Sequence, residues 1–390
     1  MIPIAYNLGS LNSRRTTTAT AVIGIALVVF VLAAALMLSS GIRKTLGSTG
    51  KPDVGMVIRK GSDAELSSNF DLANVSLILD GPEVRRNPEG KAIGVGEVVV
   101  VAAMDKIGTA VGIANVNVRG VPDNVMQMRP TVKIVEGRAA RPGTDEAICG
   151  SKIRGRFKGL QLGEKVQLKK NRPVEIVGIF DDDGTSFESE VWTDVDALRS
   201  MFGRESVVSS VRVQLTGQSS FEAFKNRIEG DKRLGLEAMR ESKYYEKQSE
   251  NLAMFLGVLG TLTAFFFSIG AMIGAMITMY AMVSSRSREV GTLRAIGFSR
   301  LSVLATFLLE AVLISLLGGL LGGIASLALG MVKFSVMNFA TWSEIVFTFH
   351  PTPEILIVST MAAVIMGVFG GFLPAVQAAR LSPILAMRGE

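Results

Sequence analysis

Residues that could carry chemistry are scarce in this chain. Its 390 residues include one cysteine, Cys149, and one histidine, His350. A zinc site needs several nitrogen or sulfur ligands at short spacing, and a catalytic relay needs a nucleophile beside its base. The sequence offers neither pattern around these two residues. We therefore expect no metal site and no catalytic residue, and a protein that is not an enzyme.

The nearest approach to a nucleotide-binding loop is the run from Gly47 to Pro52, which reads GSTGKP. A phosphate-binding loop needs a glycine five residues before the second one, and Ser or Thr directly after its lysine. The run lacks that first glycine, and Pro52 follows Lys51. We interpret it as a flexible connector. The net charge of +6 comes without a basic stripe interleaved with aromatic residues, so we expect no nucleic-acid partner.

One carboxylate stands out because its neighbours are apolar. Glu310 lies well inside a long run of hydrophobic residues. A lone acid in lipid is costly, so its side chain should face protein or lie near the membrane surface. It could be a coupling or proton-linked site, or a protonated or hydrogen-bonded contact between helices. We favour the helix contact.

The composition indicates a membrane protein. Hydrophobic residues make up 48% of the chain and charged residues 19%, against roughly 25% charge in soluble proteins. Four apolar runs each exceed the length of about 20 residues that a membrane-spanning helix needs. The first is too long and too late for a signal peptide, so we expect it to be retained. The predicted spans are residues 18–42, 251–283, 301–332 and 354–376.

The distribution of Lys and Arg predicts the orientation. Arginines gather before the first span, in the link between the second and third, and after the fourth. Because basic loops stay in the cytoplasm, residues 1–17, 284–300 and 377–390 should be cytoplasmic, with both termini inside. Residues 43–250 and the loop 333–353 should lie outside. Residues 1–17 could form an interfacial helix or an unstructured segment.

The long segment 43–250 reads as a mixed α/β domain. Alternating or continuous apolar runs predict strands, and amphipathic stretches predict helices. Ser219 and Glu222 have the spacing of a helix-capping box. The predicted strands are Val54–Arg59, Glu97–Ala102, Val174–Phe180 and Val207–Leu215, and the predicted helices are Asp194–Phe202 and Ser219–Ile228. The fold class is therefore four transmembrane helices with a large α/β domain between the first and second.

The second apolar run is longer than a membrane is thick. Leu252–Val283 is about 32 residues, or about 48 Å as a helix, against a hydrocarbon core of about 30 Å. The polar stretch Glu237–Glu250 before it could continue the helix as a stalk. A tilted helix with a frayed end would explain the length equally simply. We favour the stalk.

The link 284–300 could form a short amphipathic helix. Val290, Leu293 and Ile296 recur at three-residue spacing, and Gly297 suits the position just after a helix end. Such a helix could lie across the membrane face and offer an apolar residue to a partner protein. The alternative is an ordinary basic loop.

Glycine spacing predicts close helix packing. Pairs of glycines four residues apart let helix backbones approach in lipid, although glycine is common in transmembrane helices anyway. We expect only one or two pairs to be true contacts. The pairs are Gly270 and Gly274, Gly318 and Gly322, Gly319 and Gly323, and Gly367 and Gly371.

Two strings resemble signatures of MacB–FtsX permeases. Residues 288–300, REVGTLRAIGFSR, are similar to the pattern REIGxLRAIGASR, with Phe298 where alanine is usual. Residues 374–388, PAVQAARLSPILAMR, are similar to the pattern PAxxAARLxPxxALR, with Met387 where leucine is usual. A weaker resemblance to the periplasmic core of these proteins covers residues 118–121, 134–138, 174–180 and 190–192.

The resemblance implies a mechanism. Such proteins are mechanotransmission (type VII) ABC permeases of the inner membrane, whose periplasmic domain has porter-like and sabre-like lobes. Two permease chains pair, identical or related, and each meets an ATPase. Here that ATPase would be a separate chain holding ATP and Mg, with no cofactor on this one. The implied ATPase-coupling residues are Arg286, Arg288, Glu289, Val290, Thr292, Leu293, Arg294, Ala295, Ile296 and Gly297.

Three functions remain open. The expected one is efflux or export with a periplasmic adaptor and an outer-membrane channel. The second is the release of lipoproteins to a carrier. The third is mechanical signalling that moves no substrate, as in FtsX itself, although FtsX-like proteins have a smaller outer domain than residues 43–250.

Overall fold

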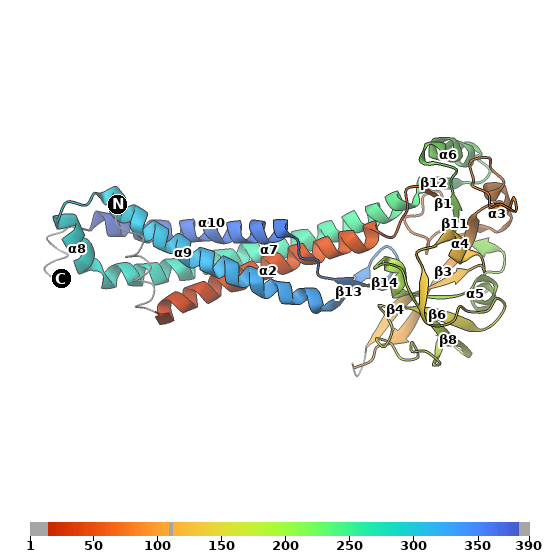
Figure 1. Cartoon of the computed structure of the whole chain (residues 1–390), viewed down its shortest axis with the longest axis horizontal. Helices are drawn as coiled ribbons and strands as arrows, with labels where there is room; N and C mark the ends of the chain where they lie inside the picture. The colour runs from red at the N-terminus through yellow and green to blue at the C-terminus, as the bar shows by residue number, and fades with distance from the viewer. Residues whose placement is uncertain (1–14, 109–111, 382–390) are drawn as a thin grey trace. The chain divides into compact units, whose positions relative to one another are not determined.

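The computed structural model of the chain describes residues 15–108 and 112–381 (Figure 1). The predictions for residues 1–14 and 382–390, including Met387, lie outside this part. The described chain forms two compact units. The helical unit contains residues up to Gly41, Ala253–Val332 and residues from Thr348 onward, and the α/β unit contains Ile42–Leu252 and Lys333–Phe347.

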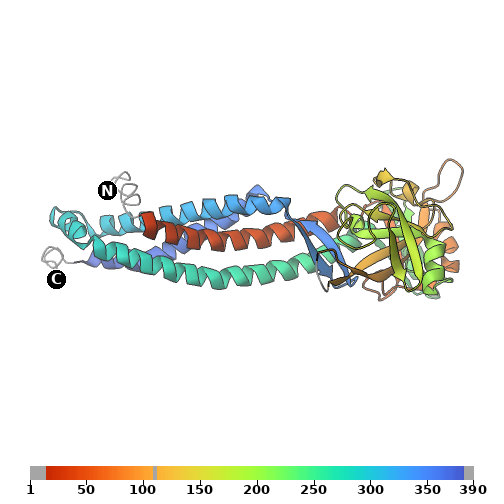
Figure 2. The same ribbon diagram turned by 90° about the horizontal axis from the view of Figure 1, so that it is seen from below.

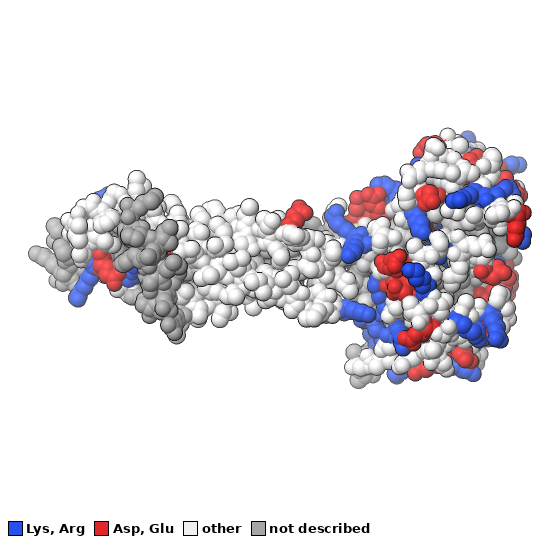
Figure 3. All heavy atoms as spheres, viewed as in Figure 1, with Lys and Arg blue, Asp and Glu red and all other residues white. Residues whose placement is uncertain are grey.

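The helical unit is built from helices that run side by side in both ribbon views (Figures 1 and 2). Four helices in the described chain are long and apolar enough to cross a membrane. Their facing residues form one buried hydrophobic cluster, and few charged side chains cover this unit on the face in Figure 3. The helices are α2 (Arg15–Gly47), α7 (Glu241–Ser285), α9 (Arg300–Leu327, continued by the 3₁₀ turn η3, Ala328–Met331) and α10 (Pro353–Arg380).

Local sequence explains where the last two helices begin. The Ser299 hydroxyl accepts a hydrogen bond from the Ser302 amide at the start of α9. Thr352 accepts one from the Ile355 amide at the start of α10, and Pro353 occupies the first helical turn, where no backbone donor is needed. Pro374 lies inside α10, which continues to Arg380.

Some of the predicted glycine contacts hold the helices together. A Cβ at Gly318 or Gly322 would collide with α2, and one at Gly367 or Gly371 would collide with α9. Gly270 and Gly274 differ, because no described atom lies within 4 Å of a Cβ built on either residue. Within the described chain this pair makes no helix contact, and its packing against another chain stays a prediction.

The α/β unit contains a ten-stranded sheet with the order β12-β1-β11-β3-β4-β9-β6-β8-β5, and β7 pairs with β8. β3 is the long strand that joins its two halves. The part of β3 up to Glu97 pairs with β11, and the part from Val98 onward pairs with β4. The strands are β1 (Val54–Arg59), β3 (Gly94–Asp105), β4 (Ile113–Val121), β5 (Lys133–Gly137), β6 (Glu146–Gly150), β7 (Lys165–Lys169), β8 (Arg172–Asp181), β9 (Glu190–Asp194), β11 (Ser210–Gln214) and β12 (Leu236–Arg240).

Two hydrophobic cores lie on this sheet. One packs β3, β4 and β6–β9 against α5, and the other packs β1, β11 and β12 against α3 and α6. The change of partner along β3, at Glu97 and Val98, marks the boundary between them. The remaining elements are β2 (Phe70–Asp71), α3 (Ala73–Leu79), α4 (Val125–Met128), η1 (Ser186–Ser189), α5 (Val195–Phe202), β10 (Val207–Val208), η2 (Gln218–Ser220) and α6 (Phe221–Gly230).

The two predicted helices of this unit differ in how they start. The Asp194 carboxylate accepts hydrogen bonds from the amides of Asp196 and Ala197 and so caps α5. The predicted capping box of α6 is wrong. The preceding residues form the 3₁₀ turn η2, so Ser220 becomes the residue before the helix, and its side chain makes no capping hydrogen bond.

Residues 333–347, expected to be a loop, form a β-hairpin that belongs to the α/β unit. Its strands are β13 (Lys333–Asn338) and β14 (Ser343–Thr348). Lys106 pairs with Glu344, and the Asn115 amide group donates to the Trp342 carbonyl over 2.8 Å. These contacts join the hairpin to β4 and to the residue following β3. Sequence pattern could not predict them because the partners are more than 200 residues apart.

Glycine packing in the helical unit can be tested with a matched pair. We expect Gly322→Ala to destabilise the chain by about 1–3 kcal/mol, because the added methyl group meets the Ala26 backbone carbonyl, which cannot move alone. Gly274→Ala should leave stability unchanged or raise it slightly, since the methyl group enters open space and alanine favours helix. Thermal unfolding in detergent measures both. Equal effects of the two substitutions would contradict the packing.

Candidate functional site

The predicted link helix is confirmed as α8 (Ser287–Ala295), which lies between α7 and α9 (Figure 1). Ile296 forms its terminating turn, and Gly297 follows with a φ of 108°, a conformation that glycine adopts without strain. The Phe298 amide donates to the Leu293 carbonyl over 3.1 Å, which closes the helix end. The link therefore has a defined conformation.

The residues of the predicted apolar face of this helix lie in two different environments. Val290 is buried among the transmembrane helices as part of their hydrophobic cluster. Ile296 is 72% exposed. Ile296 is the residue just after the last residue of the helix, Ala295, and its amide still donates to the Thr292 carbonyl over 3.0 Å. Ile296 is therefore the exposed large apolar residue of the described link.

Charged residues of the link also separate into two groups. The Arg286 side chain is buried and donates to Glu310 over 3.0 Å and to Glu289 over 3.2 Å. Arg294 donates to the Phe298 carbonyl and helps to close the turn. The remaining predicted coupling residues are largely exposed, namely Arg288, Glu289, Thr292, Ala295 and Gly297, whereas Leu293 and Arg294 are half-buried.

The intramembrane acid Glu310 is thus a buried helix contact. Its partner Arg286 lies just after α7, and the guanidinium carbon is also 5.5 Å from the centre of the Phe307 ring. This contact supports the structural interpretation of Glu310. The Arg286 side chain packs inside the helical unit, and its predicted role in coupling to an ATPase stays a prediction. A sequence cannot indicate which arginine will reach an isolated acid 24 residues away.

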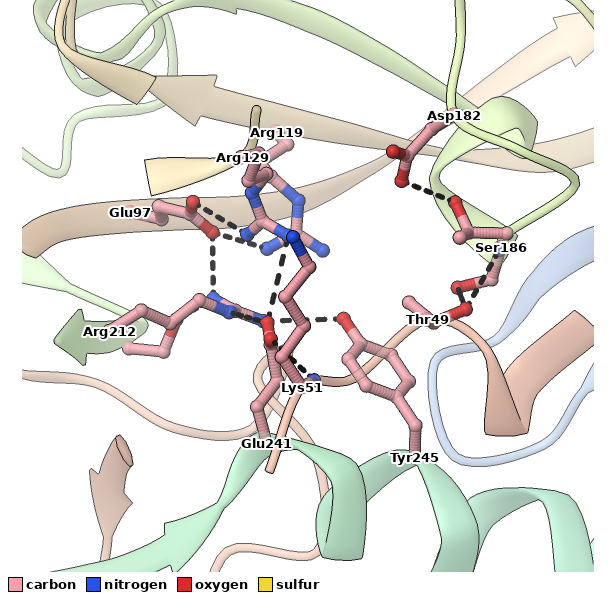
Figure 4. A network of polar contacts seen from close by, with 12 residues as sticks. Thr49, Lys51, Glu97, Arg119, Arg129, Asp182, Ser186, Arg212, Glu241 and Tyr245 are labelled. Atoms are coloured by element: carbon pink, nitrogen blue, oxygen red, sulfur yellow. Dashed lines mark hydrogen bonds and ion pairs between the residues drawn. The ribbon is translucent and has the colours of Figure 1, made fainter. Parts of the chain in front are cut away.

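A second group of polar residues lies in the core of the α/β unit (Figure 4). Arg119 of β4 makes a two-pronged contact with Glu190, with both nitrogen–oxygen distances at 2.7 Å. It also donates to Glu65 over 2.9 Å and to Glu97 over 2.7 Å. All four side chains are buried. Such charge-assisted hydrogen bonds are short and strong.

A second arginine extends the group to the start of α7. Arg212 of β11 donates to Glu97 over 2.7 Å and to Glu241 over 2.7 Å. Its other terminal nitrogen reaches the Tyr245 hydroxyl at 3.3 Å. Figure 4 shows Glu241 and Tyr245 rising from α7 toward Arg212. The first turns of α7 are therefore fixed to the centre of the sheet.

A third arginine completes what we call the ionic network. Arg129, which follows α4, donates to Glu97 over 2.8 Å and lies 3.9 Å from the centre of the Phe187 ring. The ionic network comprises Arg119, Arg129, Arg212, Glu65, Glu97, Glu190 and Glu241.

Electrostatics keep the carboxylates of Glu65 and Glu97 ionised. Burial by itself would raise the pKa of Glu65, but the attraction of Arg119 and Arg212 holds that pKa well below its ordinary range. Burial opposes ionisation of Glu97 too, yet the three arginines lower its pKa to about 2. Buried charges are tolerated only when they are paired in this way.

The sequence analysis missed this network. The sequence does contain one indication of the network. Arg119 and Arg212 each place a charge in an apolar strand next to valine, in VRGV and VRV. A charge in the middle of a buried strand must find a partner. The partners themselves come from β3, β9, α7 and the Glu65 turn, which only the fold brings together.

The two residues that opened the sequence analysis lie in different units of the chain. Burial raises the pKa of the Cys149 thiol to about 12, slightly offset by Arg154, so the reactive thiolate is disfavoured. The His350 amide donates to the Met37 carbonyl. Among residues 15–108 and 112–381, no group of three His, Cys, Asp or Glu side chains could hold a metal ion.

Comparisons with known protein families identify the family to which this chain belongs. Residues 16–231 match the MacB-like periplasmic core domain, and residues 261–383 match the FtsX-like permease C-terminal region. A core domain of this kind with several apolar helices defines a membrane-embedded ABC transporter permease. The chain belongs to the MacB–FtsX family.

Individual relatives agree with this assignment. The macrolide export ATP-binding/permease protein MacB of Escherichia coli K12 is 29% identical over 243 residues, covering 59% of this chain and 35% of that protein. MacB 1 of Yersinia pestis bv. Antiqua is 30% identical over 240 residues, covering 58% and 35%. The chain thus spans about a third of the length of these relatives.

Solved structures of similar domains show only distant likeness. The extracellular domain of the transporter YknZ from Gram-positive bacteria is 17% identical with a TM-score of 0.36, covering 48% of this chain and all of that domain. The periplasmic region of MacB from Actinobacillus actinomycetemcomitans is 10% identical with a TM-score of 0.37, covering 54% and 98%. These scores are too low to support a structural argument.

Acid should destabilise the α/β unit. The pKa of Glu97 is about 2 in the folded chain and about 4.3 in an unfolded one. Because the folded value is lower, ionised Glu97 stabilises the fold fully above about pH 4.3, and this stabilisation is lost as pH falls toward 2. We expect a nearly constant melting temperature between about pH 7 and 5, and a steep fall below about pH 4.

Thermal unfolding of the full chain in detergent across this pH range measures the effect. Glu97→Gln should melt at a lower temperature at neutral pH and lose less on acidification, because the titrating group is gone. An acid response identical to that of the unmodified chain would show that the ionic network does not titrate as described.

Proposed function

We propose that this chain is the permease subunit that couples ATP hydrolysis on a separate ATPase to a conformational change of the α/β unit, driving export. The main observation in support of this proposal is the length of α7. This helix is continuous over 45 residues, from Glu241 in the ionic network to Ser285, two residues before α8 begins. It would span about 67 Å. One helix therefore ends at the partner-facing link and starts in the core of the sheet.

The arrangement proposed here follows the orientation expected from the basic residues. The link 284–300 and both termini would be cytoplasmic, the α/β unit periplasmic, and the protein located in the inner membrane. The two hydrophobic cores of the α/β unit are candidates for the porter-like and sabre-like lobes. ATP and Mg would be bound by the ATPase, whose closure would move α8 and, through it, α7.

Further partners are proposed on the same grounds. Gly270 and Gly274 line an open groove of about 410 Å³ with Gly24 of α2, and this face suits the helix of a second permease chain. The names of the relatives, which are macrolide export proteins, favour export. A periplasmic adaptor and an outer-membrane channel are proposed with it, because the resemblance to MacB–FtsX permeases implies them. Lipoprotein release and FtsX-like signalling would use the same coupling, and transport assays with each substrate class separate the three.

The coupling segment is tested best at Ile296. We expect Ile296→Asp to leave the chain folded, because the side chain is 72% exposed, and to weaken binding of the ATPase about tenfold or more by placing a charge in an apolar contact. Co-purification with the ATPase and ATP-dependent export report the loss.

Ile113→Asp is the matched control, since Ile113 is 68% exposed and lies in β4 of the other unit. This variant should bind the ATPase normally. If Ile296→Asp retained full ATPase binding and export, α8 and its turn would not be the coupling segment.

A further inference from the structure

A small cavity lies beside the ionic network within the α/β unit. Its volume is about 20 Å³, and its walls include residues of β4, the first turns of α7 and the β13–β14 hairpin. Arg119 and Glu190 of the ionic network line one side. The other polar residues that matter for the argument are Asn117, Gln248 and Glu344, one from each of the three elements.

Each of these three residues contributes a buried polar atom that the described protein atoms leave without a hydrogen-bond partner. The atoms are Asn117 Oδ1, Gln248 Nε2 and Glu344 Oε2. Asn117 is 7% exposed and Gln248 is 9% exposed. Buried polar atoms in native proteins nearly always have a partner, which is protein or ordered water. Three such atoms around one cavity therefore indicate a ligand.

The other ends of two of these side chains are already engaged. Gln248 Oε1 accepts a hydrogen bond from Asn338 Nδ2 over 3.2 Å, which leaves the amide nitrogen as the group available to the cavity. Glu344 Oε1 pairs with Lys106, which leaves Oε2 available. Among the atoms without a protein partner, the cavity thus presents one amide nitrogen donor and two oxygen acceptors.

We infer that this cavity binds one structural water molecule. Water can accept the hydrogen bond of Gln248 Nε2 and donate its two hydrogens to Asn117 Oδ1 and Glu344 Oε2. The volume fits, because about 10–15 Å³ suffices for one water, and buried waters make about three hydrogen bonds. A metal cation would satisfy the two oxygens and be repelled by the amide N–H group.

The bound water has a positioning role. It would join β4 and the first turns of α7 to the hairpin that connects α9 and α10 in the chain. The direct hydrogen bond from Asn338 to Gln248 links only the hairpin and α7. With the water, all three elements share one junction next to Arg119. This role does not depend on the proposed export function.

A high-resolution structure of the full chain in detergent tests the site directly. We expect one density peak at about 2.7–3.2 Å from each of the three atoms. A peak with oxygen distances of about 2.3–2.6 Å and no contact to Gln248 would instead indicate a cation such as calcium. Direct contacts among the three side chains with no peak between them would also overturn the inference.

A double-mutant cycle supplies an independent test. No direct hydrogen bond joins Asn117 to Gln248, so any coupling between them passes through the water. We expect Asn117→Leu and Gln248→Met each to lower the melting temperature by roughly 2–4 °C, and the double variant to lose no more than the larger single loss. Additive losses would contradict a shared water.

The control cycle pairs Asn117→Leu with Asn124→Leu. The Asn124 amide donates to the Gly94 carbonyl elsewhere in the same unit, and Asn124 does not line the cavity. These two losses should add. Non-additivity of the same size in this cycle would show that the first result reflects general destabilisation, and the water site would lose its support.

Discussion

The fold of the α/β unit depends on one constraint, which is that charges removed from water must be paired. Three arginines and four glutamates meet in the ionic network, and each carboxylate has a guanidinium within hydrogen-bonding distance. Removing one partner would leave a buried charge uncompensated, which is strongly destabilising. The strands and helices that each supply one charged residue to the ionic network are therefore held at fixed positions. Glu97 holds the junction of the two halves of the sheet, and Glu241 holds the start of α7.

An arginine–glutamate contact is found at each end of α7. Glu241 in its first turn meets Arg212 of the sheet, and Arg286 directly after its last residue meets Glu310 of α9. Each contact is buried within its own unit. A helix fixed at both ends by charge pairs, with an apolar middle segment facing lipid, is suited to transmit a displacement along its axis. This combination is the physical basis for the proposed coupling.

Much of the fold could be predicted because it depends on local pattern. The apolar runs indicated the four long helices, and Gly297 indicated the end of α8, since glycine adopts a positive φ without strain. Strand β1 was predicted with its observed bounds because Val54–Arg59 is a compact apolar run.

The rest depends on contacts between residues far apart in the chain. Glu65 reaches Arg212 across 147 positions, and no spacing rule reports such a pair. Val290 is buried among other helices and Ile296 is exposed, although the two residues share one spacing pattern, because burial depends on what packs against each residue. Gly270 and Gly274 show the same limit, because a glycine pair reveals a small surface and does not reveal what covers it. The candidate site was thus predicted at the link and missed in the sheet.

Hydrogen exchange of the backbone amides is the most direct measurement of the central claim, that the ionic network fixes the first turns of α7 to the sheet. Glu241→Ala removes the acid that meets Arg212, and Glu246→Ala removes an exposed acid of the same helix. The account predicts that exchange over residues 241–252 becomes faster by about tenfold or more in Glu241→Ala only, while residues 261–283 stay protected. Unchanged protection of residues 241–252 in Glu241→Ala would contradict it.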